Sequence, residues 1–195
     1  MTYKIKTSTT LKLIGLLAIV IFIVSSCIPG TDKWKEEVKL SNGRVIVIER
    51  ELVLESGGDE WASNSSGSKP KEDRLKFTNP DKPGEIIEWH SMKISPQRWP
   101  EVPLILDITS NKITVFASVF ALGGCNIYTK YIYQNGIWIE EKLPSTFEAH
   151  ATNLYIFQNE GLSYINLNKK RENISDSGSK HFAQVGPTNP DCSHR

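Results

Sequence analysis

The sequence contains little cysteine and histidine, the side chains from which many metal centres and nucleophilic sites are built. Three cysteines and four histidines occur among 195 residues, and the histidines are widely dispersed. Apart from Cys192 beside His194, none of them stands at the spacing of zinc ligands. We therefore predict no metal and no cofactor for the folded part of the chain.

Recognised catalytic motifs are also absent from the sequence. No Gly-x-Ser-x-Gly turn presents a serine nucleophile, and no glycine-rich loop carries the lysine of a phosphate site. The adjacent acids Glu36-Glu37 and Glu140-Glu141 are expected on strands, where neighbouring side chains point to opposite faces, so neither pair forms a carboxylate dyad. These absences favour a protein that is not an enzyme.

One long apolar run exists, and it lies near the start of the chain. It extends from Leu13 to Val24, follows three lysines without any acid, and precedes Ser25, Ser26 and Cys27. The run has about 12 residues, too few for a membrane span of ~20. A basic start, a short apolar run and small residues are typical of a secretory signal peptide.

Val24-Ser25-Ser26-Cys27 resembles the cleavage site of bacterial lipoprotein precursors, in which an aliphatic and two small residues precede a cysteine. The resemblance implies that diacylglycerol is attached to Cys27, that signal peptidase II cuts between Ser26 and Cys27, and that the new amino terminus is acylated. Residues 1–26 are then the signal peptide, and residues 27–33 are a lipidated tether. A thiolate suits this lipid transfer, because it is a strong nucleophile.

The residue after the cysteine bears on which membrane holds the anchor. Ile28 occupies the position where, in Gram-negative relatives, an aspartate favours retention in the inner membrane. The expected location is therefore the periplasmic face of the outer membrane, with the inner membrane as the alternative.

The chain after the tether is also similar to small lipoproteins of Gram-negative bacteria. The similar segments are Trp34–Val38, Gly43–Val47 and Gly58–Ser63. This second resemblance implies no particular activity, and it assigns no functional residue.

Removal of the signal peptide changes the charge and the cysteine count. The formal net charge of +1 includes three lysines of the first 26 residues, so the remaining chain is near −2. A slightly acidic domain is a poor nucleic-acid binder. Cys125 and Cys192 then form an even pair in an oxidising compartment, which favours a disulfide. Two unpaired thiols are the alternative.

Strand-like runs joined by turns dominate the rest of the chain. Asn42-Gly43 and Asn135-Gly136 each separate two β-rich runs, which is the strongest short signal for a hairpin. Helical character is limited to Ser145–Thr152. About ten short strands predict one all-β domain over residues 34–170, an antiparallel sandwich or barrel-like fold, with a polar tail over 171–195.

The expected loops carry the candidate recognition residues. Trp61 lies in a long loop expected over Ser56–Glu72, and Arg98 and Trp99 lie in a proline-rich extended connection expected over Ser95–Pro103. Large side chains of these types in loops often mark binding surfaces. The alternative is that both tryptophans cap the open end of the β-core.

These observations predict a membrane-anchored lipoprotein whose periplasm-facing β-domain binds a protein or another envelope component. Two alternatives stay open. One is a periplasmic inhibitor or immunity protein that neutralises a toxin. The other is an envelope hydrolase whose site is assembled from distant strands, an arrangement that leaves no local sequence motif.

Overall fold

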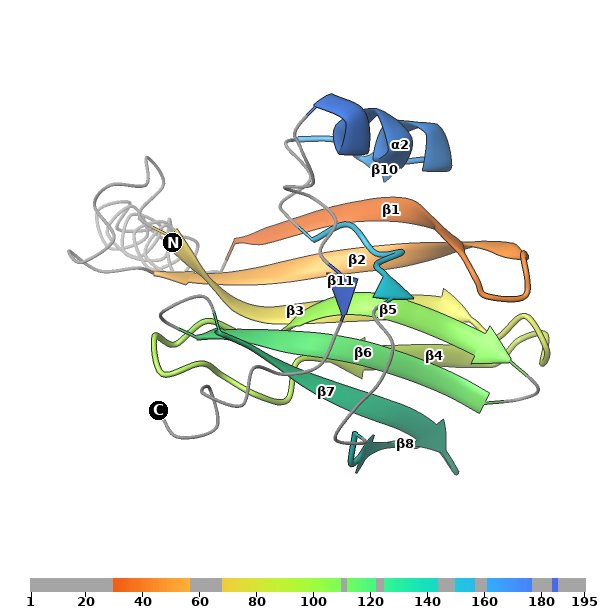
Figure 1. Ribbon diagram of the computed structural model, residues 1–195, viewed down its shortest axis with the longest axis horizontal. Coiled ribbons are helices and arrows are strands. Elements are labelled where there is room, and N and C mark those ends of the chain that lie inside the picture. The colour runs from red at the N-terminus through yellow and green to blue at the C-terminus, as the bar shows by residue number, and fades with distance from the viewer. Residues whose placement is uncertain are drawn as a thin grey trace, which may run out of the picture. The chain divides into compact units, whose positions relative to one another are not determined.

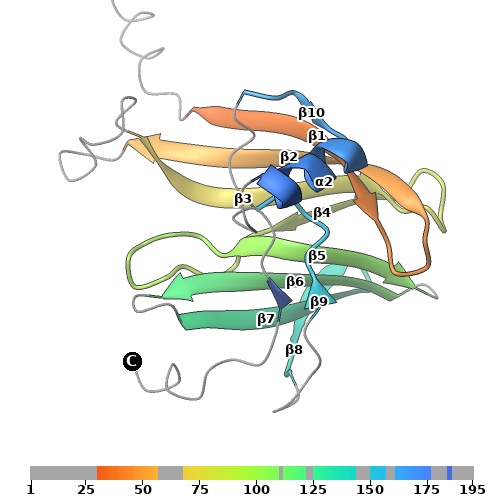
Figure 2. The same cartoon turned by 45° about the horizontal axis from the view of Figure 1, so that its top comes forward.

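The fold is a sandwich of two sheets, seen edge-on in Figure 1 and turned in Figure 2. The computed structural model describes residues 30–56, 68–109, 112–121, 125–143, 150–156, 161–176 and 184–185. The larger sheet has the strand order β10-β1-β2-β3-β4, the smaller has β5-β6-β7-β8, and β9 pairs with β11. The bounds are β1 Thr31–Lys39, β2 Val45–Ser56, β3 Ser68–Thr78, β4 Ile86–His90, β5 Val102–Thr109, β6 Lys112–Ala121, β7 Cys125–Gln134, β8 Ile137–Glu141, β9 His150–Ala151, β10 Tyr164–Ile165, α2 Leu167–Asp176 and β11 Gln184–Val185.

The hydrophobic core lies between the two sheets. Strand side chains alternate between faces, so every second residue of a strand points inward. The larger sheet contributes Val38, Ile48, Leu75 and Trp89, and the smaller sheet contributes Leu106, Val115 and Tyr131 among others. The predicted all-β sandwich is therefore confirmed, and the sheets do not close into a barrel.

Both predicted Asn-Gly hairpins are present. Gly43 has a φ of 85° in the β1–β2 turn, and Asn135 and Gly136 have φ values of 52° and 84° in the β7–β8 turn. Two successive residues with positive φ are the signature of a type I′ turn, whose twist matches that of the strands it joins. The sequence signal and the structure agree at both turns, and the β1–β2 turn is also held by Ser41, whose N–H and hydroxyl donate to the Asp107 carboxylate at 2.9 and 2.7 Å.

Two local predictions about strands were wrong. The loop expected over Ser56–Glu72 ends earlier, because β3 begins at Ser68 and pairs with β2 across a bulge at Val53/Leu54. The sequence also predicts a last strand pair formed by Leu154–Gln158 and Ser163–Leu167. Residues 154–156 are not in a strand, and residues 157–160 lie outside the described residues. Instead the two-residue strand β10 joins the edge of the larger sheet, parallel to β1, with Tyr164 opposite Lys35.

The helix expected over Ser145–Thr152 is wrong at its end, and residues 145–149 lie outside the described residues. His150–Ala151 belongs to strand β9, and the described helix is α2, which runs across the expected start of the polar tail. Asn166 caps it, since its side-chain oxygen accepts the Lys169 N–H at 2.8 Å. Within the described part of the chain, no helix has the length and apolar character to cross a membrane.

Candidate functional site

The β4–β5 loop, residues 91–101, carries two of the residues singled out from the sequence. Trp99 is 37% exposed and Arg98 is also exposed. Two further apolar side chains of the loop face solvent, Met92 at 42% and Ile94 at 66% exposure. The loop therefore exposes one tryptophan, one methionine, one isoleucine and one arginine side chain within eight residues of sequence.

A tight turn fixes the tip of this loop. The Ser95 hydroxyl accepts the Trp99 N–H at 2.9 Å, while the Ser95 N–H donates to the Trp99 carbonyl at 2.7 Å. The Arg98 N–H donates to the Ser95 carbonyl at 2.8 Å, and Arg98 itself has a φ of 63°. A non-glycine residue in the left-handed region carries backbone strain, which persists only where surrounding contacts impose it.

The base of the loop is held by a buried carboxylate. Glu101 is fully buried and accepts the N–H groups of Met92 at 2.7 Å and Lys93 at 3.2 Å. It also accepts the Tyr131 hydroxyl at 2.8 Å. Burial raises the pKa of Glu101, against the lowering effect of these hydrogen bonds. Glu101 thus ties the loop to strand β7 and keeps its exposed side chains in one arrangement.

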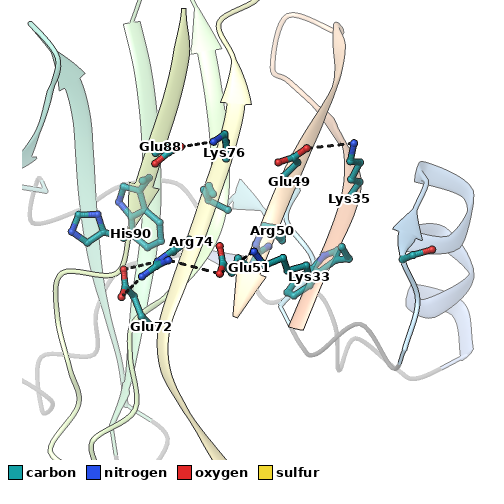
Figure 3. Close-up of a pocket in the computed structure, with 14 residues that line it drawn as sticks. Lys33, Lys35, Glu49, Arg50, Glu51, Glu72, Arg74, Lys76, Glu88 and His90 are labelled. Carbon is teal, nitrogen blue, oxygen red and sulfur yellow. Dashed lines mark hydrogen bonds and ion pairs between the residues drawn. The ribbon is translucent and has the colours of Figure 1, made fainter. Parts of the chain in front are cut away.

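A second candidate is a hollow on the outer face of the larger sheet, with a volume of about 620 Å³. Figure 3 shows its charged side chains arranged over β1 to β4. Strand register places them in two cross-strand rows, one of which alternates in charge over all four residues and one of which alternates as far as Arg74 and ends in His90. The rows are Lys35, Glu49, Lys76 and Glu88, and Lys33, Glu51, Arg74 and His90.

The charges of the hollow are paired with one another. Lys35 approaches Glu49 at 3.4 Å, and Lys76 approaches Glu88 at 2.7 Å. A hydrogen bond from Lys76 lowers the pKa of Glu88, and the same bond raises the pKa of Lys76. Both changes move the pKa away from neutrality, whereas a general acid or base works best with a pKa near the operating pH. The Lys76–Glu88 pair is therefore not tuned for proton transfer near neutral pH.

The inner face of the same strands holds a buried ion cluster, consisting of Glu36, Arg50, Asp73 and Lys170. Arg50 donates to Glu36 at 2.8 Å and to both Asp73 oxygens at 3.0 and 3.1 Å. All four residues are at most 4% exposed. Burial raises the pKa of Asp73 to about 6, against the pull of Arg50.

Lys170 brings helix α2 into this cluster. Its ammonium group lies 2.9 Å from Glu36 and donates to the Glu37 carbonyl at 2.6 Å and to the Asn153 carbonyl at 2.7 Å. Burial lowers the pKa of Lys170, while Glu36 opposes that change. The charges of the two acids and the two bases balance within the cluster. Its role is therefore to hold α2 and the strands together.

The buried ion cluster is not predicted by any sequence motif, although β2 carries a signal for it. Arg50 stands in register with Ile46, Ile48 and Leu52 on β2, and those apolar residues define the inward face. A charged residue within an apolar alternation needs a buried partner of opposite charge. Glu36 likewise lies two residues after Trp34, on the inward face of β1. The sequence therefore offered Glu36 as a buried partner for Arg50.

The other candidate residues are not brought together by the described structure. Trp61, Ser26, Cys27 and Cys192 lie outside the described residues, and Cys125 begins β7. The lipid site and the disulfide therefore stay predictions. The described residues contain no group of three or more His, Cys, Asp or Glu side chains placed to hold a metal ion.

Comparison of the chain with protein-family models, with curated proteins and with solved structures finds no significant match.

Proposed function

We propose that this chain is a non-enzymatic lipoprotein, anchored through lipid on Cys27 at the periplasmic face of the outer membrane, and that its sandwich binds a protein partner. The binding surface in this proposal is the hollow on the larger sheet. The lipoprotein-type cleavage site supports the anchor, and the alternating charge rows of the hollow support the binding role.

The alternating rows are the observation that carries the binding role. Five basic residues and four glutamates line the hollow, and the fifth base, Arg50, is paired with buried Glu36 and Asp73. The remaining charges are balanced, so neither a polyanion nor a polycation is favoured. A partner protein with the opposite alternation would match the row from Lys35 to Glu88 and the first three residues of the other row. Electrostatic complementarity of this kind contributes mainly to specificity and to the rate of association.

A charge swap tests the binding surface. The double substitution Lys76→Glu and Glu88→Lys is made in the full chain. It keeps the cross-strand ion pair but exchanges the positions of the positive and the negative charge in the row. Cross-linking in the native envelope should capture a defined partner with the parent chain and lose it with the swapped chain. The matched control is Lys130→Glu with Glu141→Lys, an ion pair between β7 and β8 of the smaller sheet, which should leave capture unchanged.

Two outcomes would contradict the proposal. Equal capture by the swapped and parent chains would place recognition away from the hollow. Hydrolysis of a cell-wall or lipid substrate by the purified chain would contradict the non-enzymatic role. The anchor is tested separately, because Cys27→Ala should abolish acyl labelling and leave the precursor uncleaved.

A further inference from the structure

The β4–β5 loop lies at the end of the sandwich where the chain enters its first strand. Lys33, near the start of β1, is in register with Glu51, Arg74 and His90, and His90 is the last residue of β4. Figures 1 and 2 both show the connection from β4 to β5 at the end where β1 begins. The opposite end of the sheet carries the β1–β2 and β3–β4 turns.

Chain length then places this end close to the proposed anchor. β1 begins at Thr31, inside the expected tether of residues 27–33, and four residue steps separate Thr31 from Cys27. Four steps span at most ~14 Å of extended chain. A lipidated Cys27 would therefore hold this end of the sandwich within one short reach of the bilayer surface.

We propose that the β4–β5 loop rests in the lipid–water interface of the membrane that holds the anchor. This inference depends on the lipid anchor of the proposed function. It assigns Trp99, Ile94 and Met92 to the interface, and Arg98 to the lipid phosphates, so that the loop fixes the orientation of the domain. The hollow then lies on the side of the sandwich, between its membrane end and its far end.

The chemistry of the loop favours a lipid surface over a protein partner. Tryptophan prefers the interfacial region, where its ring is shielded and its N–H stays hydrated, and arginine can reach the phosphates from a shallow position. The exposed charge of the loop is positive, because its one acid, Glu101, is buried. Hydrogen bonds to Ser95 and Glu101 hold the loop backbone, so its apolar side chains are already exposed before the loop meets the membrane. The loop therefore loses little conformational freedom on binding.

The test compares two exposed isoleucines at opposite ends of the larger sheet. Ile94 is 66% exposed in the loop, and Ile86 is 59% exposed at the start of β4. Full-length lipidated chains with Ile94→Cys or Ile86→Cys are labelled with nitrobenzoxadiazole and placed in vesicles of phosphatidylethanolamine and phosphatidylglycerol. The labelled parent chain gives the background from the native cysteines.

The expected result is that emission from the label at position 94 shifts to shorter wavelength and resists quenching by aqueous iodide. The label at position 86 should stay fully quenchable. Adding Met92→Asp should restore quenching at position 94, because a carboxylate is poorly accommodated in the interface. Only the backbone N–H of Met92 takes part in the loop's hydrogen bonds, so this change leaves the pinned turn in place.

The possible failures are distinguishable. A chain that floats with the vesicles but shows equal quenching at positions 94 and 86 would overturn the interfacial loop and leave the anchor intact. A parent chain that does not float with vesicles, and carries no acyl group, would overturn the anchor and this inference with it. Shielding at position 94 that Met92→Asp leaves unchanged would also overturn the interfacial loop.

Discussion

Both faces of the larger sheet carry ion pairs between arginine and carboxylates, but the pairs on the two faces have different roles. On the inner face, Arg50 is 1% exposed and lies between Glu36 and Asp73. On the outer face, Arg74 is 44% exposed and lies 2.9 Å from Glu72, a comparable distance, and 3.8 Å from Glu51. Water screens the outer pairs and leaves their partners exchangeable, whereas the inner pairs are shielded from both water and salt. Contact distance alone therefore does not tell whether an ion pair holds the fold or serves recognition.

The largest expected difference between the faces follows from removing their arginines. Arg50→Met leaves two buried carboxylates without their main partner, and breaking a buried pair in this way typically costs about 3–5 kcal/mol. Arg74→Met should cost only a small fraction of that, because its partners remain hydrated. Urea unfolding of both variants measures the difference, and equal losses would contradict the contrast between the two faces.

The pH dependence of stability should have opposite sign on the two faces. Asp73 has its pKa raised to about 6, so its contribution to stability is fully present below about pH 4 and is lost as the pH rises through 6. Glu88 has its pKa lowered by Lys76, so its contribution is present above its ordinary pKa and is lost as the pH falls.

Two neutral variants isolate these contributions. The stability of the parent chain relative to Asp73→Asn should fall between pH 4 and pH 7, by on the order of 2 kcal/mol. The stability relative to Glu88→Gln should instead rise slightly over the same range. Urea unfolding at several pH values measures both free energies. If both differences changed with pH in the same direction, burial would not explain a difference between the two faces in the pH dependence of stability.

The fold could be predicted from sequence where local chemistry decides it. Asn135-Gly136 forms the expected tight turn, and Ile113–Ala121, whose apolar residues on both faces predict a central strand, lies in β6 between β5 and β7. Helix α2 could not be predicted in this way, because Lys170 is its buried contact and looks like a solvated charge in the sequence. Its partner Glu36 lies more than 130 residues earlier, so only the folded chain brings the two together.

The candidate site, like the fold, could be predicted only in part from the sequence. Arg98 and Trp99 stood out as large side chains in an extended connection, and both are exposed on the pinned loop. Glu101, which holds that loop, gave no signal, since its hydrogen-bond partner Tyr131 comes from the second sheet. The charge rows of the hollow depend on strand order, which sequence alternation alone does not determine.

A smaller effect is expected where the buried cluster holds helix α2. Lys170→Met leaves the carbonyls of Glu37 and Asn153 without their donor, and an unsatisfied buried acceptor costs about 1–2 kcal/mol. Amide exchange of α2 should accelerate more than that of β6. The matched control is Arg171→Met on the exposed side of the same helix. Equal acceleration by both variants would mean that α2 is not held through the buried ammonium group.

The smallest effect concerns the pair between Lys76 and Glu88 on the outer face. A double-mutant cycle with Lys76→Met and Glu88→Gln should give a slight favourable coupling in dilute buffer, because the two side chains are directly opposite each other and 2.7 Å apart. The coupling should vanish in ~1 M salt, where the Debye length is only ~3 Å. The same cycle on Arg50 and Asp73 should be insensitive to salt, since ions do not enter the core. A salt-resistant coupling between Lys76 and Glu88 would mean that the outer pairs are not exchangeable, and a rigid pair of that kind would be a poor surface for recognising a partner by charge.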